Sequence, residues 1–378
     1  MSEWKEYKLE ELTEPIKDTF NPDGSDDYTY IGLEHIEQET LRLNSIGVSS
    51  DVTSNKFLFK ANDVLFGKLR PYFRKVVKPQ FEGICSTDIW VFRAKKGFYQ
   101  NYLYYFIANW DFVNTANSGE GGTRMPRADW NFLKTTEWKL PPLPEQIQIA
   151  SILSSLDDKI DLLHRQNKTL EQLAETLFRQ WFVEEAVGDN IKLGEVVKTS
   201  SGGTPSRSKM EYYSNGTIKW VKSKELQGGY IFETEETVND EAVKNSSAKL
   251  FPTNTILIAM YGATVGEYGI LAEPATCNQA ICALIPNENY PYTFLFILTK
   301  FNKENLINMA GGSAQQNISQ ELIQELEIPK SNERIKEFHR EAEPLFQKIK
   351  SNTKQMRTLT QLRDTLLPKL MSGEVRVA

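Results

Sequence analysis

A basic stretch with aromatic residues between its charges lies at residues 67–75, which read Gly-Lys-Leu-Arg-Pro-Tyr-Phe-Arg-Lys. Arginine can make bidentate hydrogen bonds to guanine edges or to phosphates, lysine supplies a point charge, and tyrosine can pack on sugars or bases. Pro71 restricts the backbone of the stretch. The residue types and their spacing therefore favour binding of a nucleic acid. The alternative is a surface hairpin whose cations only keep the protein soluble.

The cations are concentrated in two segments, although the chain of 378 residues has a formal net charge of −6. Phosphate recognition needs a basic surface, so the net charge alone argues against it. Residues 56–78 contain seven cations and one acid, Asp63, and residues 198–224 contain six cations and one acid, Glu211. Many of the acids gather elsewhere, including residues 233–241. We therefore predict that each segment forms a basic surface. The alternative for either segment is that its cations cluster by chance in solvated loops.

Residue patterns typical of catalytic or metal sites are missing from the sequence. No two of the three histidines, His35, His164 and His339, have the spacing of metal ligands, and no GxxxxGK[ST] phosphate loop occurs. The Asn/Asp-Pro-Pro-aromatic tetrad of amino-methyltransferases is also absent. We therefore expect a binding protein that is not an enzyme.

The cysteines and the apolar segments indicate the compartment. Cys85 and Cys277 each lie in an apolar run, which predicts buried thiols in a reducing environment. No run of about 18 apolar residues occurs, and the first residues are polar, so neither a membrane span nor a signal peptide is expected. The predicted location is the cytoplasm.

The chain contains an internal repeat. Residues 169–177 (TLEQLAETL) match residues 358–366 (TLTQLRDTL) at an offset of 189 (358 − 169). Cys85 and Cys277 are separated by 192 (277 − 85). We therefore predict two tandem copies of one module, related by a pseudo-twofold axis and suited to a target with two parts.

Each copy combines a globular domain rich in β-branched and aromatic residues with a long helix. The run Leu-Pro-Pro-Leu-Pro at 140–144 ends the first globular domain, because neither a helix nor a central strand tolerates it. A helix is expected near residues 100–109. The predicted strands are 56–60, 64–67 and 89–93 in the first copy and 255–260, 269–271 and 280–285 in the second.

Apolar residues then recur at alternating steps of four and three from Ile149 to Trp181, which is a heptad pattern. Residues 145–183 would form a helix about 58 Å long at roughly 1.5 Å per residue. A second such pattern runs from Ile335 to Leu370.

The two helices are expected to pair antiparallel and to act as a spacer between the globular domains. Asn167 and Asn352, polar residues in the heptad pattern, would meet near the middle and fix the register. Pro344 should kink or restart the second helix.

Several short motifs are distributed over essentially the whole chain. The motifs of the first half are 61–72 (ANDVLFGKLRPY), 83–88 (GICSTD), 125–127 (MPR), 142–146 (PLPEQ) and 152–157 (ILSSLD). Those of the second half are 202–206 (GGTPS), 215–220 (NGTIKW), 277–279 (CNQ) and 366–375 (LLPKLMSGEV). In these motifs and in their order, the chain resembles the specificity subunit of type I restriction-modification enzymes.

The resemblance implies an α+β fold with two mixed α/β target-recognition domains, separated by an antiparallel pair of long coiled-coil helices in a pseudo-twofold tandem repeat. The expected boundaries are 1–143 for the first recognition domain, 144–185 for the first helix, 186–330 for the second domain, and 331–378 for the second helix and tail.

The resemblance also implies the function and the partners. Each recognition domain would read one half of a bipartite double-stranded DNA target, and the chain itself would be neither catalytic nor bound to a cofactor. Two modification subunits would methylate adenine with S-adenosylmethionine, and restriction subunits would use ATP and Mg. A protein-binding coiled-coil scaffold without DNA specificity is the alternative, whereas a single-chain methyltransferase would need the missing motifs.

DNA contacts are expected from both copies. Residues 259–266 of the second copy align with the basic stretch but lack its charges, as reading a different base sequence would require. The expected contacts are Lys68, Arg70, Tyr72, Arg74, Lys75, Arg124 and Arg127 in the first copy, and Thr204, Ser206, Arg207, Lys209, Lys222, Lys224, Tyr261, Gln315 and Gln316 in the second.

Overall fold

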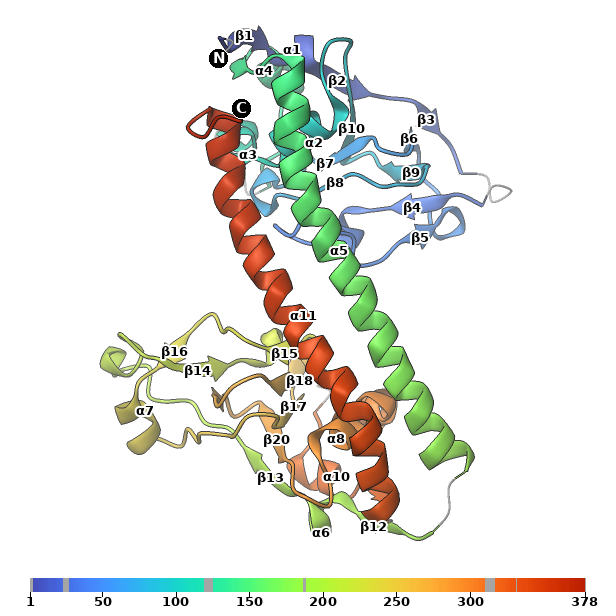
Figure 1. The fold of residues 1–378 in the computed structure, drawn as a ribbon, viewed down its shortest axis with the longest axis vertical. Coiled ribbons are helices and arrows are strands. Elements are labelled where there is room, and N and C mark those ends of the chain that lie inside the picture. The colour runs from blue at the N-terminus through green and yellow to red at the C-terminus, as the bar shows by residue number, and fades with distance from the viewer. Residues whose placement is uncertain are drawn as a thin grey trace. The chain divides into compact units, whose positions relative to one another are not determined.

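The structure is a computed structural model that describes residues 3–22, 27–118, 125–185, 188–309, 317–330 and 332–377. The chain forms two compact units, one of Met1–Ile160 with Thr358–Ala378 and the other of Asp161–Arg357. Two long helices, α5 (Leu143–Arg179) and α11 (Asn332–Ser372), each contribute one segment to either unit (Figure 1).

The first unit contains two main sheets and a short antiparallel pair of strands. The short pair joins β1 (Lys5–Lys8) to β11 (Glu137–Leu140). One sheet has the order β2 (Thr13–Ile16), β10 (Ile89–Ala94), β7 (Val64–Gly67) and β8 (Val76–Val77). The other has the order β3 (Thr19–Phe20), β6 (Lys56–Phe59), β9 (Gly83–Ser86), β4 (Thr29–Ile31) and β5 (Gly47–Val48). The three strands predicted for this copy are confirmed.

Helix α2 (Gln100–Ala108) lies at the centre of the first unit, and its residues from Tyr102 to Ala108 are all buried. They share one core with Phe66 of the first sheet and with Leu153 of α5. The unit is completed by helices α1 (Leu9–Leu12), α3 (Trp110–Ser118) and α4 (Trp130–Leu133) and by the 3-10 turns η1 (Leu33–His35), η2 (Ser49–Asp51) and η3 (Pro71–Phe73).

The second unit repeats this plan. Its strand pair is β12 (Asn190–Lys192) with β21 (Glu327–Pro329). Its larger sheet has the order β13 (Lys198–Ser201), β20 (Ile281–Ile285), β17 (Ile256–Ala259), β18 (Tyr268–Leu271) and β15 (Tyr230–Ile231). A smaller sheet has the order β16 (Thr237–Val238), β14 (Ile218–Val221) and β19 (Thr276–Cys277). The strands predicted for this copy are confirmed.

The second unit also contains several helical elements (Figure 1). They are α6 (Leu193–Val196), α7 (Asp240–Lys244), α8 (Tyr292–Phe301), α9 (Lys303–Met309) and α10 (Gln320–Gln324), the 3-10 turns η5 (Met210–Tyr212), η6 (Ser223–Glu225) and η7 (Gly262–Thr264), and the π-helical turn η4 (Gln180–Glu184) after α5.

The topology confirms the internal repeat. The order β2-β10-β7-β8 corresponds to β13-β20-β17-β18, and the parallel pair of β4 with β9 corresponds to the parallel pair of β14 with β19. Cys85 and Cys277 lie in the corresponding strands β9 and β19, and both thiols are free and buried, as expected. Burial raises the pKa of the Cys85 thiol to about 12.

Segments of the two long helices pair antiparallel within each unit, as predicted. In the second unit Phe178 packs on Phe338, with ring centroids 5.9 Å apart, and further along Asn352 Nδ2 donates to Asn167 Oδ1 at 2.9 Å. Asn167 Nδ2 in turn donates to Thr353 Oγ1 at 3.2 Å. The two asparagines therefore meet as expected, and because amides need matched partners in a buried seam, they specify one register.

Helix α11 continues without a break through Pro344, so of the expected kink or restart the restart is wrong, and the kink stays a prediction. A proline inside a helix removes one N–H donor and crowds the preceding turn. Phe338, Ala342 and Phe346, on either side of it, are all buried. Their packing on the second unit stabilises the helix through the position where its own hydrogen bonding is weakest.

The buried face of α11 also departs from the expected heptad pattern. The heptad pattern predicts that Leu345 and Leu362 are buried. Leu345 is only partly buried and its neighbour Phe346 is fully buried, whereas Leu362 is 44% exposed and its neighbour Arg363 is buried. A straight α-helix has 3.6 residues per turn and drifts relative to a repeat of 3.5. The helix must also contact the globular part of its own unit, as Phe346 does with Phe296 at a centroid distance of 5.3 Å.

Candidate nucleic-acid interface

The basic stretch of the first copy forms a tight turn, residues 68–75, which we call the recognition turn. It connects β7 to β8 and contains η3. Arg70 and Arg74, which flank η3, have φ values of 52° and 47°. These left-handed conformations are uncommon for residues other than glycine and concentrate at functional sites. A Cβ on Gly67, before the turn, would lie 2.8 Å from Leu33 Cδ2 and 3.2 Å from Lys75 Cβ, so a side chain there would require these neighbours to shift.

Residues 125–127 lie alongside the recognition turn. Arg70 N donates to Pro126 O at 2.8 Å, and Leu69 and Arg127 form a β-bridge. Tyr72 and Met125 are 41% and 59% exposed. The structure therefore brings together four of the predicted contacts, namely Lys68, Arg70, Tyr72 and Arg127.

Asp88 moderates the charge of this surface. Arg127 Nη2 lies 3.4 Å from Asp88 Oδ1, and the backbone of Lys68 donates to Asp88 O at 2.9 Å. Burial lowers the pKa of the Lys68 ammonium, and the nearby Asp88 carboxylate partly opposes this effect. The Asp88 carboxylate therefore neutralises part of the positive charge of this surface.

The prediction that Arg74 contacts DNA is wrong, because its side chain is buried and only 2% of the residue is exposed. Its Nε donates to Ala108 O at 2.7 Å, and its guanidinium lies 5.2 Å from the centre of the Trp110 ring. Lys75 is also drawn inward, and its Nζ donates to the backbone carbonyl of Leu33. Both cations hold the turn onto the unit instead of presenting charge to solvent.

An equivalent arrangement occurs in the second unit without the cations. Tyr261, which follows β17, forms a β-bridge with Asn317 and is 43% exposed. This pair corresponds to the bridge between Leu69 and Arg127 in the first unit. The predicted contacts Arg124, Gln315 and Gln316 lie outside the described residues.

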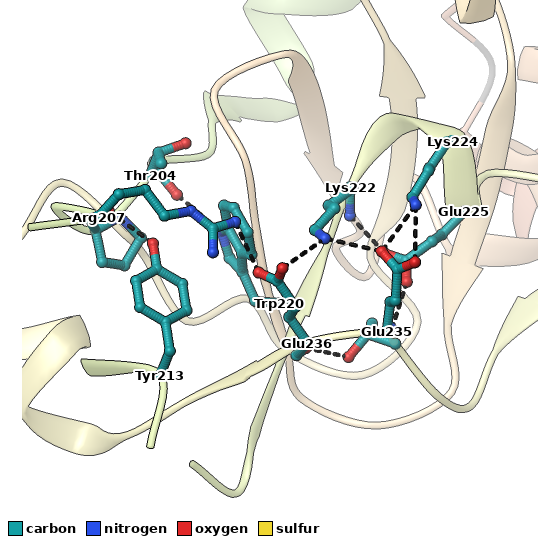
Figure 2. A network of polar contacts seen from close by, with 12 residues as sticks. Thr204, Arg207, Tyr213, Trp220, Lys222, Lys224, Glu225, Glu235 and Glu236 are labelled. Atoms are coloured by element: carbon teal, nitrogen blue, oxygen red, sulfur yellow. Dashed lines mark hydrogen bonds and ion pairs between the residues drawn. The ribbon is translucent and has the colours of Figure 1, made fainter. Parts of the chain in front are cut away.

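A second group of predicted residues gathers around β14, and Figure 2 shows it. The Arg207 guanidinium lies over the rings of Tyr213 and Trp220, 4.3 and 5.0 Å from their centroids. Its Nη2 donates to Glu236 Oε2 at 2.7 Å. Stacking on two rings and one charged hydrogen bond fix an arginine whose side chain remains half exposed.

Glu235 and Glu236 also pair with the two lysines of this region. Lys222 Nζ lies 2.9 Å from an oxygen of each carboxylate, and Lys224 Nζ lies 2.8 Å from Glu235. Hydrogen bonds from Lys224 and Lys222 lower the pKa of Glu235 to about 2. We call Arg207, Lys222, Lys224, Glu235 and Glu236 the charge cluster. Its three cations meet two acids, so the basic surface expected here is largely neutralised.

Three other predicted residues surround the charge cluster. Ser206 Oγ lies 2.8 Å from Ser208 Oγ, and Lys209 Nζ donates to Tyr212 OH at 3.0 Å. Thr204 Oγ1 donates to Gln279 Oε1. The next residue, Ala280, accepts from the backbone N–H of Met260 at 2.8 Å. Residues 279–280 therefore contact both the Thr204 loop and the strand end that carries Tyr261.

The Gly202-Gly203 pair has a structural cause. A Cβ on Gly202 would lie 2.2 Å from Cys277 O, and one on Gly203 would lie 2.3 Å from the backbone carbon of Ser247. Only glycine allows this close approach of backbones. Trp220 Nε1 donates to Gly203 O at 3.0 Å, so the pair also fixes the ring on which Arg207 stacks.

Sequence reasoning missed the aromatic rings and the acids of this surface. Tyr213 and Trp220 lie inside the basic segment 198–224 but were not among the expected contacts, and neither was Asp88. One signal was available, because the acidic residues 233–241 follow closely on the basic residues 198–224. Oppositely charged runs near each other in sequence are expected to pair when strands bring them together.

Two further observations concern the described part of the chain. No group of three or more His, Cys, Asp and Glu residues there could hold a metal ion. None of the helices described is long and apolar enough to cross a membrane.

Comparison with known proteins identifies the family. A family model described as "Type I restriction modification DNA specificity domain" matches residues 1–172 and 189–335. The specificity subunit of type I restriction enzyme MjaIX from Methanocaldococcus jannaschii is 29% identical over 309 residues, which cover 75% of this chain and 71% of that protein. The specificity subunit of HindI from Haemophilus influenzae is 23% identical over 465 residues, covering 99% of this chain and all (100%) of that protein.

A solved structure shows the same fold. It is the S subunit of a type I restriction-modification system from M. genitalium, with a TM-score of 0.58, 18% sequence identity, and coverage of 97% of this chain and 96% of that one. The matches favour DNA specificity over the protein-binding scaffold that the sequence also allowed. Because the family model matches both halves and most of the sequence, the chain belongs to the family of type I restriction-modification DNA specificity subunits.

Proposed function

We propose that each unit reads one half of a bipartite double-stranded DNA target and that the bases between the halves are not contacted. One observation carries this proposal. Both units place the residue that follows a central strand against a second segment, in the bridges of Leu69 with Arg127 and of Tyr261 with Asn317. The side chains at these matched positions differ, as two different half-sites would require.

The chain would act as the specificity subunit of a larger complex. In this proposal it joins two modification subunits, which methylate adenine with S-adenosylmethionine, and restriction subunits, which use ATP and Mg. The chain itself holds no cofactor, carries out no catalysis, and works in the cytoplasm. Its family membership supports this assignment.

The isolated chain is proposed to bind DNA weakly. Affinity for DNA of any sequence depends on cations that neutralise phosphates. In the first unit Arg74 is buried, and in the second Arg207, Lys222 and Lys224 are paired with carboxylates. Specific binding should then require the modification subunits, which add contacts of their own.

Sequencing of methylated adenines tests the proposal. The chain is co-expressed with its modification subunits in a host without other adenine methylation, and cells that lack only the chain serve as the control. Two short conserved half-sites at a constant separation are expected. A single uninterrupted motif would contradict the bipartite assignment, and unchanged methylation without the chain would contradict its role in specificity.

A further inference from the structure

A network of charged side chains in the first unit connects the recognition turn to the long helices. Arg363 of α11 donates from Nη1 to Asp157 Oδ1 of α5 at 2.9 Å and from Nη2 to Asp364 Oδ1 at 3.0 Å. Arg74 Nη2 of the recognition turn lies 3.8 Å from the same Asp364 oxygen. Tyr105 OH donates to Asp157 Oδ2 at 2.7 Å, which extends the network to α2.

The two arginines of this network are almost completely buried. The side chains of Arg74 and Arg363 are each 3% exposed, whereas the Asp157 and Asp364 side chains keep 21% and 39% of their surface. Burying a guanidinium is costly unless carboxylates and hydrogen-bond acceptors surround it. Asp364 is the carboxylate shared by both guanidiniums, so it also separates two like charges.

The network differs in the described part of the second unit: at the repeat offset of 189, Asp364 corresponds to Glu175 (364 − 189), which pairs with Lys300 of α8, but the buried ion pair of Asp157 with Arg363 is replaced. At the repeat offset of 189, Asp157 corresponds to Phe346 (157 + 189) and Arg363 to Ala174 (363 − 189). Both Phe346 and Ala174 are buried in the apolar core of the second unit. Apolar packing is therefore sufficient for folding at the equivalent position of the second unit. Buried ion pairs often contribute less stability than apolar residues of similar size. The buried pair of Asp157 with Arg363 in the first unit therefore calls for a reason other than stability.

The backbone of the recognition turn supplies that reason. Arg70 and Arg74 both adopt left-handed conformations, which persist only where surrounding contacts fix them. Arg74 makes those contacts through Ala108, Trp110 and the shared Asp364. A recognition site needs such supporting contacts, because small displacements of its side chains weaken discrimination.

We propose that Asp364 is a positioning residue for DNA recognition by the first unit. Through Arg74 it fixes the recognition turn and with it Arg70 and Tyr72, which face the DNA. The long helices therefore take part in base discrimination, besides any role as a spacer. This inference rests on the proposed function, because it assigns the recognition turn to one half-site.

The test compares Asp364→Asn with Glu374→Gln in the complex with the modification subunits. Both changes remove one carboxylate charge near the end of α11, but Glu374 pairs with Lys369 at 3.4 Å and belongs to no buried network. Methylation rates are measured on duplexes that carry the matched target, one mismatched base in the first half-site, or one mismatched base in the second.

Asp364→Asn is expected to reduce discrimination against first-half mismatches about five- to tenfold, near the lower limit for one base contact. Discrimination against mismatches in the second half-site should stay unchanged. Glu374→Gln should leave discrimination in both half-sites unchanged. Equal losses in both half-sites, or no loss in either, would overturn the proposal. The second half-site is an internal control, because unfolding of the chain would lower methylation of every duplex together.

Two further variants separate positioning from stability. Asp364→Glu keeps the charge and should restore most of the discrimination lost in Asp364→Asn. Arg74→Lys keeps the charge of Arg74 but loses the planar guanidinium, so it should relax the first half-site as Asp364→Asn does. Failure of Arg74→Lys to change discrimination would overturn the inference. Failure of the proposed function is recognised separately, because the unmodified complex would then show no bipartite methylation.

Discussion

Removing the two acids of the charge cluster should make DNA binding stronger and less selective. In the double variant Glu235→Gln and Glu236→Gln, the side chains keep their size but lose their charges. Arg207, Lys222 and Lys224 then lose their carboxylate partners, and the net charge of the cluster rises from +1 (3 − 2) to +3. Cations that are free of carboxylates can neutralise phosphates of any DNA sequence.

The magnitude follows from counterion release. Each additional phosphate that is neutralised adds about 0.9 to the slope of log affinity against log salt, so two additional phosphates add up to about 1.8. A fourfold rise in salt, from about 50 to about 200 mM, would then weaken binding by the variant about twelvefold more than binding by the unmodified protein. At low salt the affinity for scrambled DNA should rise most, because the acids no longer compete with phosphates.

Fluorescence anisotropy of labelled matched and scrambled duplexes, with the complex at several salt concentrations, measures this effect. Glu325→Gln with Glu327→Gln is the matched control, because it removes two exposed charges, one at the end of α10 and one in β21, and neither residue belongs to the charge cluster. A slope that stays the same in the cluster variant, or that rises equally in the control, would refute the reasoning. In either case the cluster would not face DNA.

Three further predictions follow from other parts of the molecule. Arg70→Ala should cost about 1–3 kcal/mol of discrimination at one base of the first half-site, and a methylation profile altered in the second half-site would contradict it. Asn352→Ala should lower the free energy of unfolding by about 1–3 kcal/mol, because Asn167 Oδ1 loses the hydrogen bond that Asn352 Nδ2 donates. An unchanged midpoint of urea unfolding would count against this prediction. Inserting four residues after Asn167 adds roughly 6 Å of helix, which is close to two base pairs at about 3.4 Å each. Sequencing of methylated adenines should then show unchanged half-sites separated by more base pairs. Altered half-sites with an unchanged separation would show that the long helices do not set the distance between the half-sites.

Periodicity and repetition made most of the fold predictable. The repeat offset implied two similar units, and the strands around 64–67 and 256–259 follow from short apolar runs between turn residues. Asn167 and Asn352 were predictable partners, because polar residues in an apolar seam must meet. The path through Pro344 was not predictable, because it depends on packing with distant parts of the chain.

The site was harder to predict, because charge in a sequence does not reveal where the charge is neutralised. Arg70 and Arg74 belong to the same basic stretch, but Arg74 is buried against the carbonyl of Ala108. Lys222 has a negative partner only because β14 and β16 pair antiparallel and bring the residues before β16 beside it. Such pairings depend on tertiary structure, which local sequence patterns do not encode.

The division of the chain into units has a consequence for synthesis on the ribosome. The second unit is one continuous stretch, Asp161–Arg357, whereas the first needs Thr358–Ala378 to complete its core, into which Leu367 and Leu370 are packed. Domains fold when all of their sequence is present. The unit that contains residues 3–160 therefore becomes complete only after the second unit has been synthesised, and a stop codon just before Thr358 would leave its core without Leu367 and Leu370.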